Sequence, residues 1–178
     1  MRAIILNGHG GVDALEYVEN FPDPECGKDD VVVRVKSTSL NYHDIFTRNG
    51  MPGIKISMPM ICGLDVAGEI AEIGANVSGW KIGERVLIDP RNRVEGGLVG
   101  ETIHGGLAEY CRVKEHQLVR IPDGVSFDQA SSLPVAYGTA HRMMMTIGQV
   151  TSDDKILILG ASGGVGTCLL YTSDAADE

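Results

Sequence analysis

A glycine-rich turn near the end of the chain is the stretch whose composition is best suited to binding a ligand. The apolar residues 156–159 precede it, and a second apolar segment follows it. This order predicts a buried parallel strand over 156–159, a tight turn, and a helix over about 164–170. Glycine lets the backbone approach a pyrophosphate, and the N–H groups that open the helix face the phosphate charge. The residues predicted to bind the phosphates, unless the turn is purely structural, are Gly160, Ala161, Ser162, Gly163, Gly164, Val165 and Gly166.

Many short β-branched or alternating segments, separated by glycine and proline, come before this turn. Strands are predicted within residues 2–6, 15–18, 31–36, 63–74, 80–88, 105–113 and 117–121. A short helix is predicted over Asn41–Thr47. Short strands joined by glycine turns are typical of a compact, barrel-like β domain, which we expect over residues 1–125.

The composition changes at residue 126. Ser126 and Gln129 have the spacing of a capping box, in which the two side chains satisfy the first free amides of a helix. A second helix is predicted over Val135–Ile147, and its methionine run, 143–145, is expected to pack in the core. Residues 126–178 are therefore predicted to form a helical connector that leads into the strand, turn and helix described above.

Composition and charge exclude several classes of protein. The 178 residues are 43% hydrophobic, which is enough for a buried core, and their net charge of −9 argues against nucleic acid or an anionic membrane surface as a partner. The four cysteines include no Cys-x-x-Cys pair, so they are expected to be small buried hydrophobes. The first apolar run is too short for a secretory signal or a membrane span, and a cytoplasmic location is expected.

Several short sequence motifs, in a fixed order, resemble those of the medium-chain dehydrogenase/reductase superfamily. The motifs are Leu40-Asn-Tyr-His-Asp44, Gly63-Leu-Asp65, Gly83-Glu-Arg-Val86, Gly105-Gly-Leu-Ala-Glu-Tyr110, Ile121-Pro-Asp-Gly124 and Gly160-Ala-Ser-Gly-Gly-Val-Gly166. The resemblance implies a mainly β GroES-like barrel domain, followed by the start of an α/β Rossmann domain. It places the active site in the cleft between them.

The departures from that pattern predict that no metal is bound. Zinc-dependent members have a cysteine where Asn41 stands and a histidine where Leu64 stands, and residues 89–104 lack the four cysteines of their structural zinc lobe. His43 and Asp65 would supply only two ligands, whereas catalytic zinc normally has three protein ligands. The chain thus resembles the zinc-independent quinone oxidoreductase and enoyl reductase branch. Members of this branch transfer hydride from NADPH (or NADH) to a quinone, an enone or another activated alkene.

The resemblance also implies roles for individual residues. Asn41 and Tyr42 would lie beside the nicotinamide and the substrate, with the Tyr42 hydroxyl as a donor. His43 stands where zinc-dependent members place a proton-relay hydroxyl, although it could instead be a solvated helix residue. Asp44 and Arg48 are four residues apart and are expected to form a structural ion pair that braces the cleft, with direct catalysis by Asp44 as the alternative. Thr139 is expected to approach the nicotinamide.

The end of the chain does not continue the expected domain. Residues 168–178 have three acids and almost no large apolar side chain after Tyr171, so they cannot continue the buried face of a helix. They resemble translated sequencing adaptor, and we expect a non-native tail from about 168–171, with a genuine acidic tail as the alternative. The parent protein is expected to be longer, to act on a small molecule and to form a homodimer or homotetramer, whereas the chain itself is expected to be inactive. A zinc-type alcohol dehydrogenase and a non-catalytic GroES-like binding module remain as alternatives.

Overall fold

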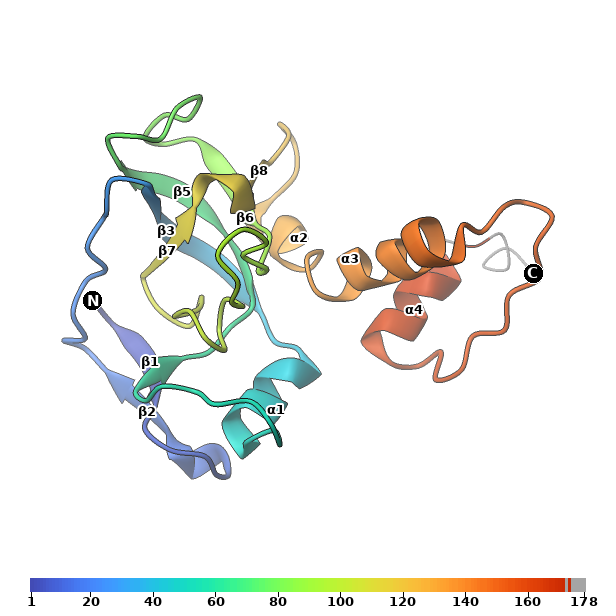
Figure 1. Ribbon diagram of the computed structural model, residues 1–178, viewed down its shortest axis with the longest axis horizontal. Helices are drawn as coiled ribbons and strands as arrows, with labels where there is room; N and C mark the ends of the chain where they lie inside the picture. Colours follow the sequence, from blue (N-terminus) through green and yellow to red (C-terminus); the bar gives the residue numbers. More distant parts are fainter. Residues whose placement is uncertain (172, 174–178) are drawn as a thin grey trace.

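The computed structural model describes residues 1–171 and 173. The strands are β1 (Ala3–Leu6), β2 (Leu15–Val18), β3 (Asp30–Ser39), β4 (Met60–Ile61), β5 (Asp65–Ile73), β6 (Arg85–Ile88), β7 (Tyr110–Lys114) and β8 (Leu118–Arg120). The helices are α1 (Tyr42–Asn49), α2 (Phe127–Ser131), α3 (Ala136–His141) and α4 (Gly164–Tyr171), with the 3₁₀ turns η1 (Val12–Ala14) and η2 (Glu115–Gln117) and the π-helix η3 (Arg142–Gly148). Figure 1 shows the strands gathered in one body, from which α2 and α3 lead outward to α4.

Two antiparallel sheets form the β body. One has the strand order β2-β1-β4 and the other β7-β3-β5-β6-β8. β3 lies between β5 and β7, and its Val31 and Val33 are fully buried in the main core, as expected of a β-branched central strand. Gly68 on β5 allows the two strands to approach, because a side chain there would overlap the carbonyl group of Arg34.

The strands that the sequence predicts in this region are confirmed. The structure adds β4, which pairs with β1 through Ile61 and Ile5. The sequence did not predict β4 because two residues after a proline-rich loop carry no alternation to detect. Strand β3 also runs further than predicted, to Ser39, and thereby delivers the chain to the start of α1.

The predicted capping box begins α2. The Gln129 N–H donates to Ser126 Oγ at 3.1 Å, and the Ser126 N–H donates to Gln129 Oε1 at 2.9 Å. Ala130 on this helix packs on Ala67 and Ile121 of the β body. The hydroxyls of Ser131 and Ser37 lie 2.9 Å apart, so α2 is fixed to β3. This docking sets where α3 starts.

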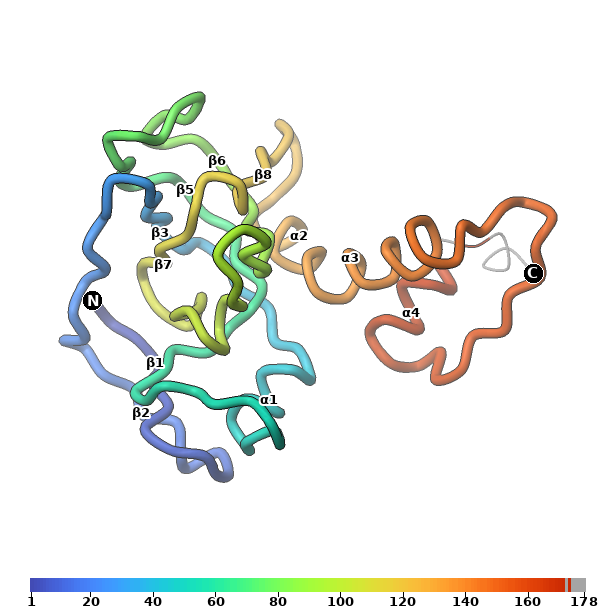
Figure 2. The backbone as a smooth tube through the Cα atoms, viewed as in Figure 1, coloured from blue at the N-terminus to red at the C-terminus, as the bar shows by residue number. Residues whose placement is uncertain are grey.

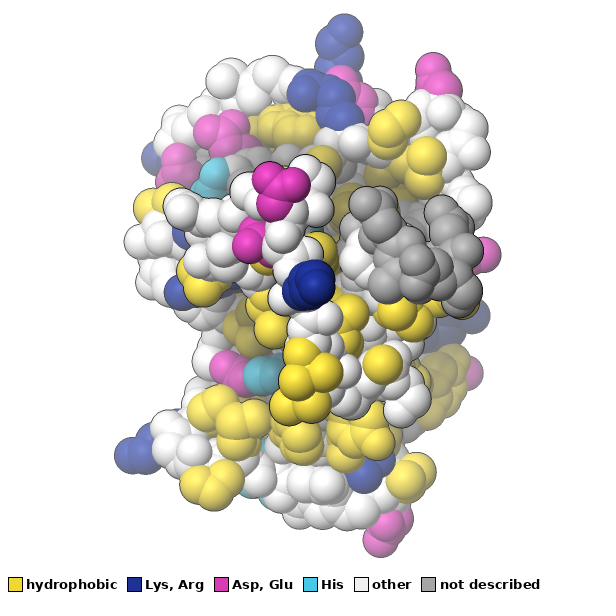
Figure 3. Space-filling model, turned by 90° about the vertical axis from the view of Figure 1, so that its right-hand side faces the viewer, with side chains coloured by type: hydrophobic (Ala, Val, Ile, Leu, Met, Phe, Trp, Pro, Cys, Tyr) yellow, Lys and Arg dark blue, Asp and Glu magenta, His cyan; other side chains and the backbone are white. Residues whose placement is uncertain are grey.

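Two predictions after residue 140 are wrong. Residues 156–159 do not form a strand, and Leu157 and Leu159 are 84% and 83% exposed. A parallel strand needs a neighbouring strand for its hydrogen bonds, and no strand in residues 1–171 lies beside it. The methionine run is also not core, because Met143 and Met145 are exposed on η3. Figure 2 shows residues 150–163 as a wide loop that returns to α4, and Figure 3 shows apolar side chains gathered on this side of the molecule.

The helix predicted after the glycine turn is confirmed as α4, which packs beside α3. The tail expected to be non-native lies partly outside the described residues, which do not include 172 and 174–178. Among the described residues, no helix combines the length and the apolar character that crossing a membrane requires. Cys62, Cys111 and Cys168 are buried, as predicted, whereas Cys26 is half-buried.

Candidate functional site

The start of α1 is held by the side chain of Asp44. Its Oδ2 accepts a hydrogen bond from the Asn41 N–H at 2.8 Å, which caps the helix, and its Oδ1 accepts one from the Gly63 N–H at 2.9 Å. Gly63 has a φ of 99°, and a side chain there would lie 2.9 Å from the backbone nitrogen of Leu107. Glycine at this position thus lets the chain before β5 pass close enough to anchor α1.

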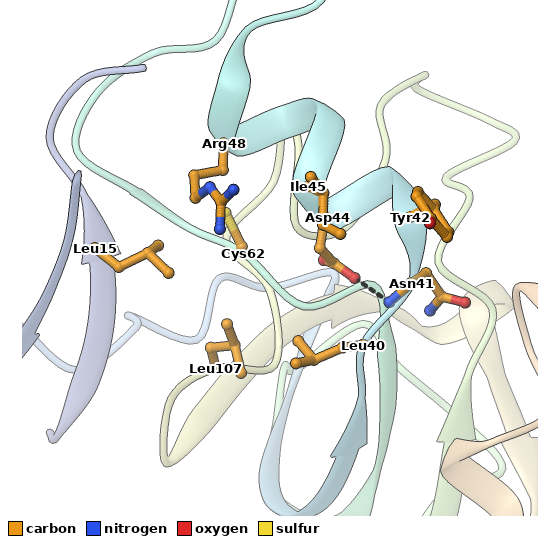
Figure 4. Close-up of a pocket in the computed structure, with 9 residues that line it drawn as sticks. All are labelled: Leu15, Leu40, Asn41, Tyr42, Asp44, Ile45, Arg48, Cys62 and Leu107. Carbon is orange, nitrogen blue, oxygen red and sulfur yellow. Dashed lines mark hydrogen bonds between the residues drawn. The ribbon is translucent and has the colours of Figure 1, made fainter. Parts of the chain in front are cut away.

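The ion pair predicted between Asp44 and Arg48 is not among the contacts of the described residues. Arg48 instead donates to the side chain of Asn49, and Figure 4 shows its guanidinium on the side of Cys62. Asp44 is buried, and each of its two oxygens accepts a hydrogen bond from a backbone N–H group. These bonds take the place of the predicted ion pair with Arg48. Burial raises the pKa of Asp44, while the bonds from Asn41 and Gly63 act in the opposite direction.

Asp65 connects the β body to the helical segment. One of its side-chain oxygens, Oδ2, accepts bonds from Ser39 Oγ at 2.6 Å and from Asn41 Nδ2 at 2.8 Å. The other, Oδ1, accepts a bond from the Val135 N–H at 2.9 Å, one residue before α3. Asp65 is 1% exposed, and this burial raises its pKa despite the three donors. The Asn41 side chain is therefore fixed in place by a buried carboxylate.

His43 has a partner that the sequence analysis missed. Its Nε2 lies 2.6 Å from Glu101 Oε2, and Glu101 is 9% exposed. His43 is therefore half-buried, and a nearly buried carboxylate holds one of its ring nitrogens. The two residues are 58 positions apart, and no local pattern links them. The feature that marks Glu101 is its burial in a glycine-rich loop, and the sequence alone does not reveal that burial.

The larger candidate cavity lies between the β body and α3. It has a volume of about 630 Å³, and both His43 and Thr139 line it. The structure therefore brings these two predicted residues to one cavity. Three arginines, Arg91, Arg93 and Arg142, also line it. Asp89 is the acid on the lining, and it is paired with Arg93 at 2.9 Å.

The other predicted catalytic residues border a different, smaller cavity of about 300 Å³. Asn41, Tyr42 and Asp44 line it together with apolar side chains from Leu15, Leu40, Ile45 and Leu107. Figure 4 shows these leucines facing α1 across the cavity. Tyr42 is 77% exposed and packs beside Phe46, with ring centroids 6.2 Å apart. The first turn of α1 thus separates the predicted residues into two groups.

The glycine turn lies at the start of α4 and lines neither cavity. Gly160 has a φ of 68°, and the Gly163 N–H donates to its carbonyl at 3.0 Å. A side chain at Gly166 would overlap the Gly160 carbonyl, whereas one at Gly163 or Gly164 would meet only contacts of 3.4 Å or more. The turn is therefore open where a phosphate would approach, and a dinucleotide fits it. A Cβ on Gly164 would lie 3.8 Å from that of Ala136, so the turn adjoins α3, which carries Thr139.

The donor set does not suit a metal. The Asn41 amide is engaged with Asp65, and Leu64, at the position of the family's histidine, is a buried apolar side chain. Within the described part of the chain, no three His, Cys, Asp or Glu side chains are grouped closely enough to hold an ion. Zinc prefers nitrogen, thiolate and carboxylate ligands, and the positions that would supply them hold an amide and an alkyl group.

Known proteins resemble this chain over most of its length. Residues 27–123 match the family described as "Alcohol dehydrogenase GroES-like domain". The chain is 31% identical to a quinone oxidoreductase of Lama guanicoe, covering 93% of this chain and 47% of the relative. It is 33% identical to the chloroplastic NADPH-dependent alkenal/one oxidoreductase of Arabidopsis thaliana, covering 96% and 43%, and 33% identical to the acryloyl-coenzyme A reductase of Sulfurisphaera tokodaii, covering 98% and 56%.

Solved structures agree with these relatives. A crystal structure of an NAD-dependent alcohol dehydrogenase has a TM-score of 0.89 at 30% identity, covering 97% of this chain and 54% of that one. The chain therefore spans about half the length of the curated relatives and structures it matches. It belongs to the family of alcohol dehydrogenase GroES-like domains, in the quinone oxidoreductase-like branch of the medium-chain dehydrogenase/reductase superfamily.

Proposed function

We propose that the protein containing this chain reduces an activated alkene, such as an enone, a quinone or an enoyl thioester, with a nicotinamide cofactor and without zinc. The observation that carries the proposal is the larger cavity, which is lined by both His43 of α1 and Thr139 of α3. NADPH is the cofactor we favour, because the Arabidopsis relative is named as NADPH-dependent.

The chain's own residues hold the cofactor and the substrate. The glycine turn 160–166 would hold the pyrophosphate, and Thr139 would contact the nicotinamide at the edge of the cavity. A bound nicotinamide supplies the hydride. The side chain of Asn41 is fixed by its 2.8 Å hydrogen bond to Asp65, and it thereby holds the first turn of α1 in place beside the larger cavity. Asp44 acts through the backbone that it caps rather than on the substrate.

Reduction of an enone places negative charge on the carbonyl oxygen, and a positioned donor stabilises that charge. His43 lines the cavity and is the donor we propose for this oxygen or for the α-carbon. Tyr42 lies on the other side of the turn, with its ring exposed, so its hydroxyl is the second candidate. The two residues can be separated by experiment because they border different cavities.

The test is single-turnover hydride transfer from NADPH to methyl vinyl ketone, followed by loss of NADPH absorbance in the whole protein. His43→Ala should slow this step by about 100-fold, the usual contribution of a general acid. Tyr42→Phe should slow it less. Titration of NADPH fluorescence reports cofactor binding separately, and Gly163→Val should weaken binding, because its side chain would stand in the open part of the turn that a phosphate approaches.

Matched control variants are available on the β body. Tyr17→Phe removes a hydroxyl from an exposed ring on β2, and His116→Ala removes an imidazole that contacts Asn92. Neither side chain lines the two cavities, so both variants should keep the wild-type rate. If neither His43→Ala nor Tyr42→Phe slows hydride transfer, the donor assignment is wrong. If NADPH does not bind, the proposed function itself fails.

A further inference from the structure

Glu101 lies in a turn that packs against Gly63, the residue whose N–H donates to Asp44 of α1. The turn is closed by hydrogen bonds from the Gly100 N–H to the Ile103 carbonyl at 2.7 Å and from the Glu101 N–H to the Leu98 carbonyl at 3.1 Å. Gly100 has a φ of 79°, and a side chain there would lie 2.9 Å from the backbone of Gly63. Since Gly63 also donates to Asp44, the turn and the helix that carries His43 are held against one backbone segment.

The contact between Glu101 and His43 favours one tautomer of the imidazole. A carboxylate accepts hydrogen bonds and does not donate them, so the 2.6 Å separation fits the tautomer that carries its hydrogen on Nε2. The other ring nitrogen, Nδ1, has no hydrogen-bond partner among the described residues. His43 lines the larger cavity, so Nδ1 is the nitrogen left to serve a substrate there.

We propose that Glu101 is a positioning residue for proton delivery by His43. This inference rests on the proposed function, in which hydride adds to the β-carbon and a proton must reach the α-carbon or the enolate oxygen. That proton leaves Nδ1 of the protonated imidazole, whose Nδ1–H bond breaks as a new C–H or O–H bond forms. The product is the neutral imidazole with its hydrogen on Nε2, which is the tautomer that Glu101 holds. Glu101 keeps its own charge throughout and does not touch the substrate.

A spectroscopic experiment on the full 178-residue chain tests this positioning directly. In ¹⁵N-histidine-labelled protein, the neutral His43 ring should carry its hydrogen on Nε2, and that proton should exchange slowly with water. Glu101→Leu keeps the side-chain volume but removes the acceptor, so exchange of the proton should accelerate by about tenfold or more. Glu95→Leu is the matched control, because Glu95 lies in the same loop but contacts Lys114 and Asn92 instead.

Two further variants keep the test decisive. If Glu101→Leu loses the native amide spectrum, Glu101→Gln replaces it, since the amide retains a polar group at the position. Glu101→Asp keeps the charge and should restore part of the exchange protection. An unchanged exchange rate of the Nε2 proton in the folded variant that lacks the carboxylate (Glu101→Leu, or Glu101→Gln in its place) overturns the proposal, and so does loss of that proton in Glu95→Leu.

The kinetic consequence separates this proposal from the proposed function. In the whole protein, Glu101→Leu should lower the single-turnover rate while leaving KM unchanged, and the double variant with His43→Ala should be no slower than His43→Ala alone. Additive losses would show that Glu101 acts independently of His43 and would overturn its positioning role. If the exchange result holds but His43→Ala has no effect on the rate, the proposed function of His43 fails while the structural contact stands.

Discussion

At the scale of the residue, Asp65 joins the two parts of the chain. Its carboxylate accepts bonds from Ser39 and Asn41 of the β body and from the Val135 N–H that leads into α3. Burial nevertheless raises its pKa, and the neighbouring charge of Asp44 acts in the same direction. The Asp65 carboxyl therefore binds its proton more tightly in the native state than in the unfolded chain. Ionisation of Asp65 consequently lowers the free energy of unfolding.

This predicts a pH dependence with a definite sign. Because the folded pKa lies above the ordinary value of 3.8, the contribution of Asp65 to the free energy of unfolding should fall as pH rises through the folded pKa. Asp65→Asn removes this slope and leaves Asp44 in place. Urea unfolding of both proteins between about pH 4 and about pH 7 measures the difference. A wild-type advantage that grows with rising pH over this range would contradict the prediction.

Single residues also show what sequence can and cannot predict about the site. The sequence motifs around Asn41 and Gly160 predicted the start of α1 and the glycine turn, because both features depend on residues that are neighbours in the sequence. Glu101 could not be found in this way, because its partner is distant in sequence and the contact depends on the packing of Gly100 against Gly63. The Asp44–Arg48 pair was predicted wrongly for the same reason, since the competing donor, Gly63, comes from another segment.

At the scale of the element, local signals were sufficient where the element supplies its own bonds. The capping box at Ser126 and Gln129 is such a case, and it formed as predicted. The strand predicted over 156–159 is the opposite case, because its apolar composition indicates burial but its hydrogen bonds must come from another strand. The same dependence applies to the methionine run, which faces the surface in the described structure.

The short helix α2 allows this reasoning to be tested. Ser126→Ala removes the side-chain acceptor for the Gln129 N–H and should lower the free energy of unfolding by about 1 kcal/mol. Ser152→Ala is the control, because Ser152 is exposed and precedes no helix. Equal losses in the two variants, measured by urea denaturation, would mean that the cap contributes nothing. Because α2 fixes the start of α3, the amide signals of Thr139 should also shift in Ser126→Ala.

At the scale of the whole molecule, the distribution of charge matters more than its total. The net charge is −9, yet the larger cavity collects three arginines against a single lining acid, Asp89. Asp89 accepts bonds from Arg93, while the side chains of Arg91 and Arg142 make no ion pair within the described residues. The smaller cavity, by contrast, has one acid and one arginine on its lining. A cationic cleft in an acidic protein attracts anions locally and repels them elsewhere.

If the protein containing this chain reduces alkenes as proposed, this imbalance predicts that it prefers an anionic alkene, such as an enoyl-coenzyme A thioester, to a neutral quinone. Arg91→Gln and Arg142→Gln should each lower kcat/KM for the thioester by about three- to tenfold and leave that for the quinone unchanged, because only the charged substrate gains from the arginines. Added salt should reduce the same preference by screening. Arg2→Gln is the control, since Arg2 pairs with Glu109 and does not line the cavity. If both arginine variants weaken NADPH binding instead, the cationic lining serves the phosphates of the cofactor, and the choice between thioester and quinone must depend on the apolar lining.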